Sequence, residues 1–251
     1  MDVVLYRNRY RNFMLKINLL GRTSSNLSGS HTLAFRTRKA EAILYYLVMA
    51  AEPIDRSTIA ELFWSDMTTA NAQKNLRSVL PGLRDLLGDY LIITNKQITF
   101  NQSLEHLVDL YELQRVLADT SLTHAEKFSQ FTRYYQGELL AGLSVANTPE
   151  FESWLAQQRE ALQQTVTIAL QQWTEHFLEQ KNFKLGLEAT QVWLKMQPWS
   201  EIAHGLRMKL FWRSKQRSAA LLQYNQCCTY LEDELGVEPS AEIKALYIQI
   251  Q

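Results

Sequence analysis

Three segments in the first hundred residues carry apolar side chains at the spacing of three and four that marks an amphipathic helix. The first covers 38–51 and ends before Pro53, and the second follows Asp55, which we expect to cap its N-terminus. The third begins near Thr69 and ends at Gly88. Its buried face is predicted to consist of Leu76, Val79, Leu80, Leu83, Leu86 and Leu87.

Short strands are expected on either side of these helices. The strand segments are 14–20, 31–35, 90–94 and 97–101. A turn-rich stretch, 21–30, separates the first two, and Asn95 with Lys96 predicts a two-residue hairpin turn between the last two. Two strands, three helices and a terminal hairpin follow one another in the order of a winged helix.

From residue 108 onward the pattern is helical almost throughout. The expected helices are 108–118, 123–135, 150–180, 182–196, 201–214, 218–235 and 241–250. Similarity at a spacing of 34 residues relates Phe177 to Phe211, Lys181 to Lys215, Gly186 to Ala220 and Leu187 to Leu221. This is the period of tetratricopeptide repeats. The predicted fold class is therefore mainly α, with a winged helix (α+β, small sheets and a wing hairpin) over 1–104 and a tetratricopeptide-like all-α domain over 105–251.

Charge is unevenly distributed along a chain whose formal net charge is zero. Residues 1–104 carry 13 Lys and Arg against 8 Asp and Glu, an excess of five positive charges. Residues 105–251 carry 13 against 18, an excess of five negative charges. This asymmetry favours a polyanionic partner for the first part alone.

The exposed face of the third helix has side chains that suit nucleic acid. Asn71, Lys74, Arg77 and Ser78 lie opposite the apolar stripe and can donate to phosphates or to base edges. Pro81 and Asp85 follow on the same face and add no positive charge. Because proline within a helix costs about 3 kcal/mol unless the helix kinks, we expect DNA recognition to rest on the first half of this helix.

The sequence offers little support for catalysis, nucleotide binding or metal binding. There is no Gly-x4-Gly-Lys-Ser/Thr loop, no plausible pair of nucleophile and base, and no metal-ligand spacing, so neither an enzyme nor a cofactor is expected. The five histidines (His31, His106, His124, His176 and His204) are expected at the surface or at helix caps. Cys227 and Cys228 are adjacent in a helical pattern, which favours packed thiols in a reducing cytoplasm.

The first part resembles a known family. The segments Phe35-Arg-Thr-Arg-Lys-Ala, Ala60-Glu-Leu-Phe-Trp and Asn75-Leu-Arg-Ser-Val-Leu-x-x-Leu-Arg resemble the OmpR-type winged helix of the Streptomyces antibiotic regulatory protein (SARP) regulators. In that family the third helix reads direct-repeat DNA and the basic start of the first helix contacts phosphate. The resemblance implies phosphate contacts by Arg36, Arg38 and Lys39, groove-facing roles for Lys74, Asn75, Arg77 and Ser78, and a place on the wing for Lys96. The family usually has Ser-Arg where this chain has Pro81-Gly82.

The second part is similar to the bacterial transcriptional activator domain that follows the winged helix in the same family. The segments that carry this resemblance are Tyr135-Gln-Gly-Glu-Leu-Leu, Phe151-Glu-Ser-Trp-Leu with Arg159, and Leu231-Glu-Asp-Glu-Leu-Gly-Val-Glu-Pro-Ser-Ala-Glu. Their local pattern is consistent, because Gly236 suits a helix C-cap and Ser240 the next N-cap.

These observations predict a sequence-specific DNA-binding transcription regulator, expected to be an activator. Its repeat domain is expected to provide a homodimer contact or a contact with RNA polymerase, in the cytoplasm at the nucleoid and without a membrane. Two alternatives stay open: a protein-interaction module with a degenerate winged helix, and the N-terminal section of a larger regulatory ATPase.

Overall fold

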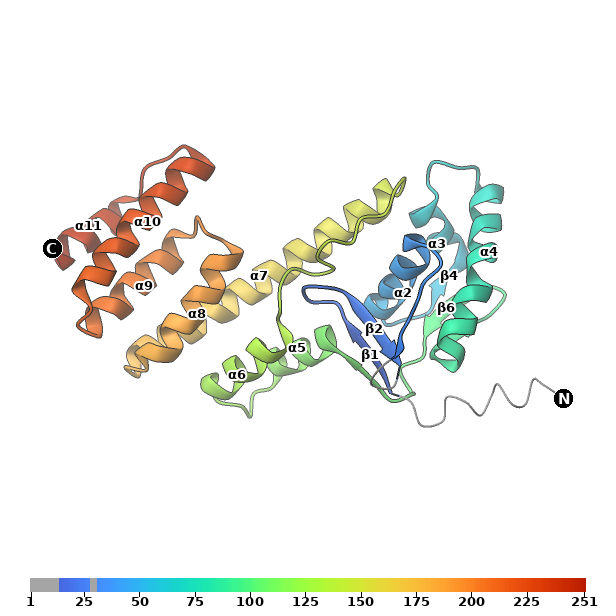
Figure 1. Cartoon of the computed structure of the whole chain (residues 1–251), viewed down its shortest axis with the longest axis horizontal. Coiled ribbons are helices and arrows are strands. Elements are labelled where there is room, and N and C mark those ends of the chain that lie inside the picture. Colours follow the sequence, from blue (N-terminus) through green and yellow to red (C-terminus); the bar gives the residue numbers. More distant parts are fainter. Residues whose placement is uncertain (1–13, 28–30) are drawn as a thin grey trace. The chain divides into compact units, whose positions relative to one another are not determined.

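A computed structural model describes residues 14–27 and 31–251 of the chain (Figure 1). The chain divides into two compact units: Met1–Arg115 with Tyr134–Ala161, and Val116–Arg133 with Leu162–Gln251. The division of the sequence at residue 104 stays a prediction.

The first unit contains two small sheets and three helices that follow one another in sequence. Its strands are β1 (Leu15–Asn18), β2 (Ser24–Leu27), β3 (His31–Thr32), β4 (Ile54–Asp55), β5 (Leu91–Ile93), β6 (Gln97–Phe100) and β7 (His106–Val108). Its helices are α2 (Arg38–Ala50), α3 (Arg56–Phe63) and α4 (Thr69–Leu87), with a 3₁₀ turn, η1 (Gly88–Tyr90), after α4. The three predicted helices and the predicted hairpin are thus present, and the order is that of a winged helix.

The four-stranded sheet has the order β3-β2-β1-β7. β1 pairs antiparallel with β2 and parallel with β7, so that Leu15 lies opposite Leu27 on one side and His106 on the other. Two features of this sheet differ from the sequence prediction, and in the second sheet no strand was expected at β4. The stretch expected to be turn-rich contains β2, and no strand was expected at β7. β2 is itself mostly polar, and β7 pairs with the distant β1, so a local hydrophobic pattern reveals neither strand.

The second sheet has the order β4-β6-β5 and forms the wing. Ile93 pairs with Ile98, and the amide of Thr94 donates to the carbonyl of Gln97 over 2.9 Å. This closes the predicted two-residue turn at Asn95 and Lys96.

The segment Tyr134–Ala161 packs on the winged helix. The first unit includes the N-terminal part of α7 (Pro149–Glu179), from which Phe151 stacks on Phe63 of α3 with ring centroids 4.8 Å apart. Trp154 meets the ring of Tyr46 edge-on, also at 4.8 Å. Phe151 and Phe63 are fully buried, so this contact is part of the core that supports α2 and α3.

The remaining helices agree with the predicted ones to within two residues at each end. They are α5 (Asp109–Ala118), α6 (His124–Tyr134), α8 (Phe183–Met196), α9 (Glu201–Arg213), α10 (Arg217–Leu235) and α11 (Ala241–Ile250). α5 runs from the first unit into the second, and α7 also contributes residues to both.

The 34-residue repeat is visible in the backbone of the second unit. α7 and α9 end alike, because Lys181 and Lys215 both take positive φ angles, 57° and 63°. After each of them an amide donates back over 2.8 Å, from Asn182 to Phe177 and from Gln216 to Phe211. Matching turns thus link α7 to α8 and α9 to α10, as expected for paired helices.

Helix α10 ends as predicted, with Gly236 in the left-handed conformation at φ 65°. Ser240 stands at the N-cap of α11, but its side chain makes no capping hydrogen bond; its amide donates to the carboxylate of Glu201 over 2.8 Å. Cys227 is buried and Cys228 half-buried, both as free thiols.

One histidine prediction is wrong. His204 is 1 % exposed and fully hydrogen-bonded inside the second unit, where α9 packs on α10. His106, His124 and His176 are half-buried, and the side chain of His31 lies outside the described residues.

Candidate nucleic-acid interface

Helix α4 separates an apolar and a polar face. Its buried residues are Ala72, Leu76, Leu80, Leu83 and Leu87, and Val79 and Leu86 are half-buried. The side chains of Asn71, Lys74, Arg77 and Ser78 are exposed on the opposite face, and Asn75 is half-buried at its flank. The predicted division into an apolar and a polar face is therefore confirmed, with Val79 and Leu86 at the edge of the buried face.

Some polar side chains of this face also make hydrogen bonds within the unit. The Oγ of Ser78 donates to the carbonyl of Asn75 over 2.7 Å, and the Nε of Arg77 donates to the carbonyl of Gln73 over 3.2 Å. Asn75 donates through Nδ2 to the sulfur of Met67 over 3.1 Å. These bonds orient the side chains. Because a guanidinium has five N–H donors and the bond to Gln73 uses one of them, Arg77 keeps donors for a ligand.

The helix continues through Pro81 to Leu87, although the sequence raised the expectation of a kink there. Proline lacks the N–H that would bond to the carbonyl of Arg77. The next residue, Gly82, lies against another chain segment: a Cβ at this position would be in ordinary van der Waals contact with the Cδ of Arg36, at 3.9 Å. Arg36 is exposed and comes from the segment before α2. It therefore brings a positive charge to the half of α4 that has Pro81 and Asp85 on its outer face.

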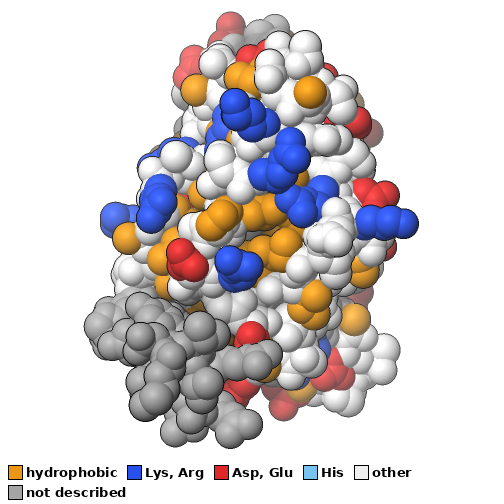
Figure 2. Space-filling model, turned by 90° about the vertical axis from the view of Figure 1, so that its right-hand side faces the viewer, with side chains coloured by type: hydrophobic (Ala, Val, Ile, Leu, Met, Phe, Trp, Pro, Cys, Tyr) orange, Lys and Arg blue, Asp and Glu red, His pale blue; other side chains and the backbone are white. Residues whose placement is uncertain are grey.

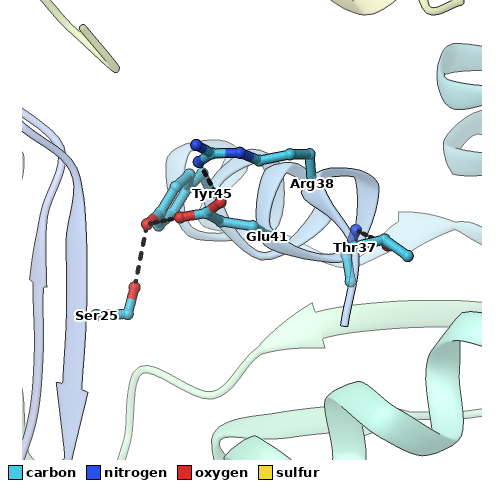
Figure 3. Close-up of polar contacts among 6 residues, drawn as sticks. Ser25, Thr37, Arg38, Glu41 and Tyr45 are labelled. Carbon is cyan, nitrogen blue, oxygen red and sulfur yellow. Dashed lines mark hydrogen bonds and ion pairs between the residues drawn. The ribbon is translucent and has the colours of Figure 1, made fainter. Parts of the chain in front are cut away.

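The start of α2 is held by a hydrogen-bonded network (Figure 3). Thr37 caps the helix by accepting from the amide of Ala40 over 3.1 Å. Glu41 accepts from Arg38 over 2.9 Å and from the hydroxyl of Tyr45 over 3.0 Å. Burial raises the pKa of Tyr45 to about 12, so its hydroxyl stays protonated as a donor. Arg38 is exposed but paired with Glu41.

Lys39 has partners inside the first unit. Its Nζ donates to the carbonyl of Phe63 over 2.7 Å and to that of Asn147 over 3.4 Å, and it lies 5.0 Å from the centroid of the Trp64 ring. Partial burial lowers the pKa of Lys39 below its usual value, and Asp66 acts in the opposite direction. Among the three basic residues at the start of α2, Arg36 is thus the one that the structure brings to α4.

Lys96 is exposed at the tip of the wing. It lies beside Arg56, a basic residue that was not among the predicted contacts. Arg56 is the first residue of α3. The sequence could have pointed to Arg56, because a cation in the first turn of a helix opposes the helix dipole and is unusual without a compensating anion. Figure 2 shows Lys and Arg side chains gathered on the face that carries α4, around a group of hydrophobic side chains.

The described part of the chain holds neither a candidate metal centre nor a candidate membrane-spanning helix. Within residues 14–27 and 31–251, no three His, Cys, Asp or Glu side chains are placed to hold a metal ion. In the same part of the chain, no helix combines the length and the apolar character needed to cross a membrane.

Comparison with known proteins gives a family and a fold. Residues 106–251, more than half of the chain, match the model of the family described as bacterial transcriptional activator domain. Among solved structures, EmbR of Mycobacterium tuberculosis in complex with a low affinity phosphopeptide is similar, with a TM-score of 0.66 and 18 % sequence identity. The match covers 95 % of this chain and 65 % of the length of that one. No curated protein sequence matches. The predicted fold class is confirmed by this likeness.

Proposed function

Because the chain belongs to the bacterial transcriptional activator domain family, we propose that it regulates transcription by sequence-specific binding to double-stranded DNA, as an activator. The resemblance to SARP-type transcriptional regulators seen in the sequence is confirmed by the family match and the fold. A protein that binds the chromosome in this way would act in the cytoplasm, at the nucleoid.

The observation that carries the proposal is the exposed polar face of α4. Lys74, Arg77 and Ser78 are exposed on a helix whose other face is anchored by buried leucines, so the helix is rigid where it would enter the major groove. Arginine and asparagine are the side chains that most often read guanine and adenine edges. Arg36, lying beside Gly82, and Lys96 on the wing would contact phosphates on either side of the helix. Arg38, Lys39, Asn71 and Asn75 remain candidate contacts of the same interface.

For the repeat domain we propose a homodimer contact or a contact with RNA polymerase. Its support is a set of large apolar side chains that are exposed in the second unit, among them Ile202, Leu222 and Ile248. Exposed apolar side chains of this size are common at protein interfaces when they form a contiguous patch.

The test begins with selection of bound sequences from a random DNA pool by the full chain. Affinity for the selected duplex is then measured over a range of salt concentrations. It should fall linearly with salt on logarithmic axes, since phosphate contacts release counterions. The Arg77→Ala variant should weaken specific binding by about 1–3 kcal/mol and relax the preference at one base pair. The stoichiometry of the same titration reports whether two chains bind one duplex.

The matched control is Arg213→Ala, which removes an exposed arginine from α9 in the second unit. It should leave affinity and sequence preference unchanged. Absence of salt-sensitive binding to any selected duplex, together with an unchanged Arg77→Ala variant, would favour the second candidate function: a protein-interaction module with a degenerate winged helix. That candidate has one observation in its favour, because Pro81 and Asp85 are both exposed on the face that would meet DNA.

A further inference from the structure

A hollow of about 430 Å³ lies between α3, α4 and the wing. We call it the α3–wing hollow and define it by its lining residues. These include Arg56 and Ser57 at the start of α3, Gln73 and Arg77 on α4, and Asn95 and Lys96 in the wing turn. All belong to the first unit, and they come from three different elements of the winged helix.

The hollow is surrounded by positive charge. Three basic residues line it, Arg56, Arg77 and Lys96, against one acidic residue, Asp55. Among residues 14–27 and 31–251, no ion pair involves any of the three basic side chains. Asp55 precedes α3 but makes no side-chain capping hydrogen bond, and the first turn of the helix contains no acidic residue. A surplus of positive charge around one concave site is the electrostatic signature of an anion-binding site.

The basic side chains are held in place by the fold. The amide of Arg56 donates to the carbonyl of Lys96 over 2.8 Å, and its Nη1 donates to the carbonyl of Thr94 over 3.3 Å. Both bonds join the start of α3 to the wing turn. On the other side of the hollow, Arg77 is oriented by its bond to the carbonyl of Gln73. A guanidinium held at one edge still has donors in its fixed plane, which is the geometry that suits a phosphate.

We propose that the α3–wing hollow binds one phosphate of the DNA backbone and that Arg56 is a contact for this phosphate. The inference rests on the proposed function, and it adds a site and a residue to it. A winged helix places its third helix in the major groove and its hairpin towards the adjacent backbone or minor groove. The backbone that divides the two grooves then has to pass between α4 and the wing, where the hollow lies. Arg56 and Lys96 would contact this phosphate from the side of the wing. Arg77, on the α4 side of the hollow, adds positive charge there and keeps its proposed role at a base edge.

The experiment measures binding of the full chain to a selected duplex in which single phosphates are replaced, one at a time, by neutral methylphosphonates. The wild type should lose about tenfold in affinity at each contacted phosphate, the size expected for a charge-assisted hydrogen bond, and one of these phosphates should be the one bound in the hollow. The Arg56→Gln variant should bind the unmodified duplex about tenfold more weakly and should not respond to the methylphosphonate at that phosphate. Its salt dependence should become shallower by about one phosphate contact, equally on selected and unrelated sequences.

Two further variants separate charge from folding. Arg56→Lys keeps the charge and should keep the salt dependence, and Lys184→Gln, which removes an exposed lysine from α8, should change neither affinity nor salt dependence. Should Arg56→Gln be unstable, Lys96→Gln, which removes an exposed lysine from the same hollow, is measured in the same scan and should also lose the response at that phosphate.

Each failure has its own signature. If the wild type shows no salt-sensitive DNA binding, the proposed function itself is wrong. If the wild type binds but Arg56→Gln responds to every methylphosphonate as the wild type does, only the site at the hollow is wrong. If inorganic phosphate at constant ionic strength binds the wild type below millimolar concentration without DNA, and Arg56→Gln abolishes this, the hollow is a site for a free phosphate compound, and its assignment to the DNA backbone is overturned.

Discussion

His204 is a buried histidine whose two ring nitrogens both have partners. Its Nε2 lies 2.8 Å from the carbonyl of Pro198, which can only accept, and its Nδ1 lies 2.6 Å from the Nε2 of Gln223, which donates. The neutral ring satisfies both bonds, with the proton on Nε2. Burial lowers the pKa of His204 below its usual value of 6.5; Arg207 also lowers it, whereas the carbonyl of Pro198 and Glu201 raise it.

A pH dependence of stability follows from this arrangement. As the pH falls through 6.5, the unfolded chain takes up a proton on His204 that the folded chain resists, so the free energy of unfolding should decrease below that pH. The His204→Gln variant should be less stable at neutral pH by about 1–3 kcal/mol, since Gln223 loses a buried partner. Its stability should nevertheless fall less between pH 7.5 and pH 5.5 than that of the wild type. Urea unfolding at several pH values measures both effects, and equal losses in the two proteins would show that His204 does not carry the dependence.

The exposure of residues in the candidate interface could be predicted wherever it follows from helix periodicity. The exposure of Lys74, Arg77 and Ser78 follows from the positions of the leucines on α4. The partners of Lys39 did not follow, because Phe63 and Asn147 are 24 and 108 residues away in the sequence. Arg56 was missed for the same reason, since its neighbours in the hollow belong to α4 and to the wing.

At the scale of helices, two glycines differ in how closely neighbouring side chains pack against them. Gly186 in α8 permits close packing on α9, since a Cβ there would lie 2.6 Å from Cδ2 of the fully buried Leu210. Gly82 in α4 faces only the stem of Arg36, at the ordinary distance of 3.9 Å.

Alanine at these two positions should therefore have opposite effects. Gly82→Ala should stabilise the protein by about 0.5–1 kcal/mol, because alanine restricts the unfolded chain and favours the helix. Gly186→Ala gains the same helix propensity but forces Leu210 to move within a packed core, a displacement that costs about 1–3 kcal/mol. We expect a net loss of stability, measured by thermal unfolding of both variants beside the wild type. A gain of stability in Gly186→Ala would show that the α8–α9 contact can adjust.

Elements defined by local patterns were predicted well, and elements defined by distant pairing were not. The helices of the repeat domain have bounds within two residues of the prediction, because their apolar spacing and their capping residues are read from adjacent positions. The strand β2 has the sequence Ser-Ser-Asn-Leu, which locally resembles a turn, and it exists because it pairs with β1 and β3. β7 similarly depends on β1, about ninety residues earlier in the chain.

At the scale of the whole molecule, the winged helix and the family domain share a core. The family match begins at residue 106, yet Tyr134–Ala161 belongs to the same compact unit as the helices of the winged helix. Arg159 on α7 donates to the carbonyls of Leu139 and Leu140, each over 2.8 Å, and the amide of Leu140 donates to the carbonyl of Leu19 over 2.7 Å. The segment is thus fastened to the end of β1 as well as to α2 and α3.

The stability of the DNA-binding part should then depend on a residue far outside 1–104. Phe151→Ala should lower the free energy of unfolding of the first unit by about 3–5 kcal/mol, because it leaves a cavity against the buried Phe63. When DNA binding is measured during urea unfolding, it should be lost at a lower urea concentration in this variant than in the wild type.

The matched control is Leu170→Ala, which changes an equally buried residue of the same helix that belongs to the second unit. It should lower the stability of the second unit and leave the urea concentration at which DNA binding is lost closer to that of the wild type. Equal shifts in the two variants would mean that the units unfold together, and no shift in Phe151→Ala would mean that the DNA-binding part is stable without α7.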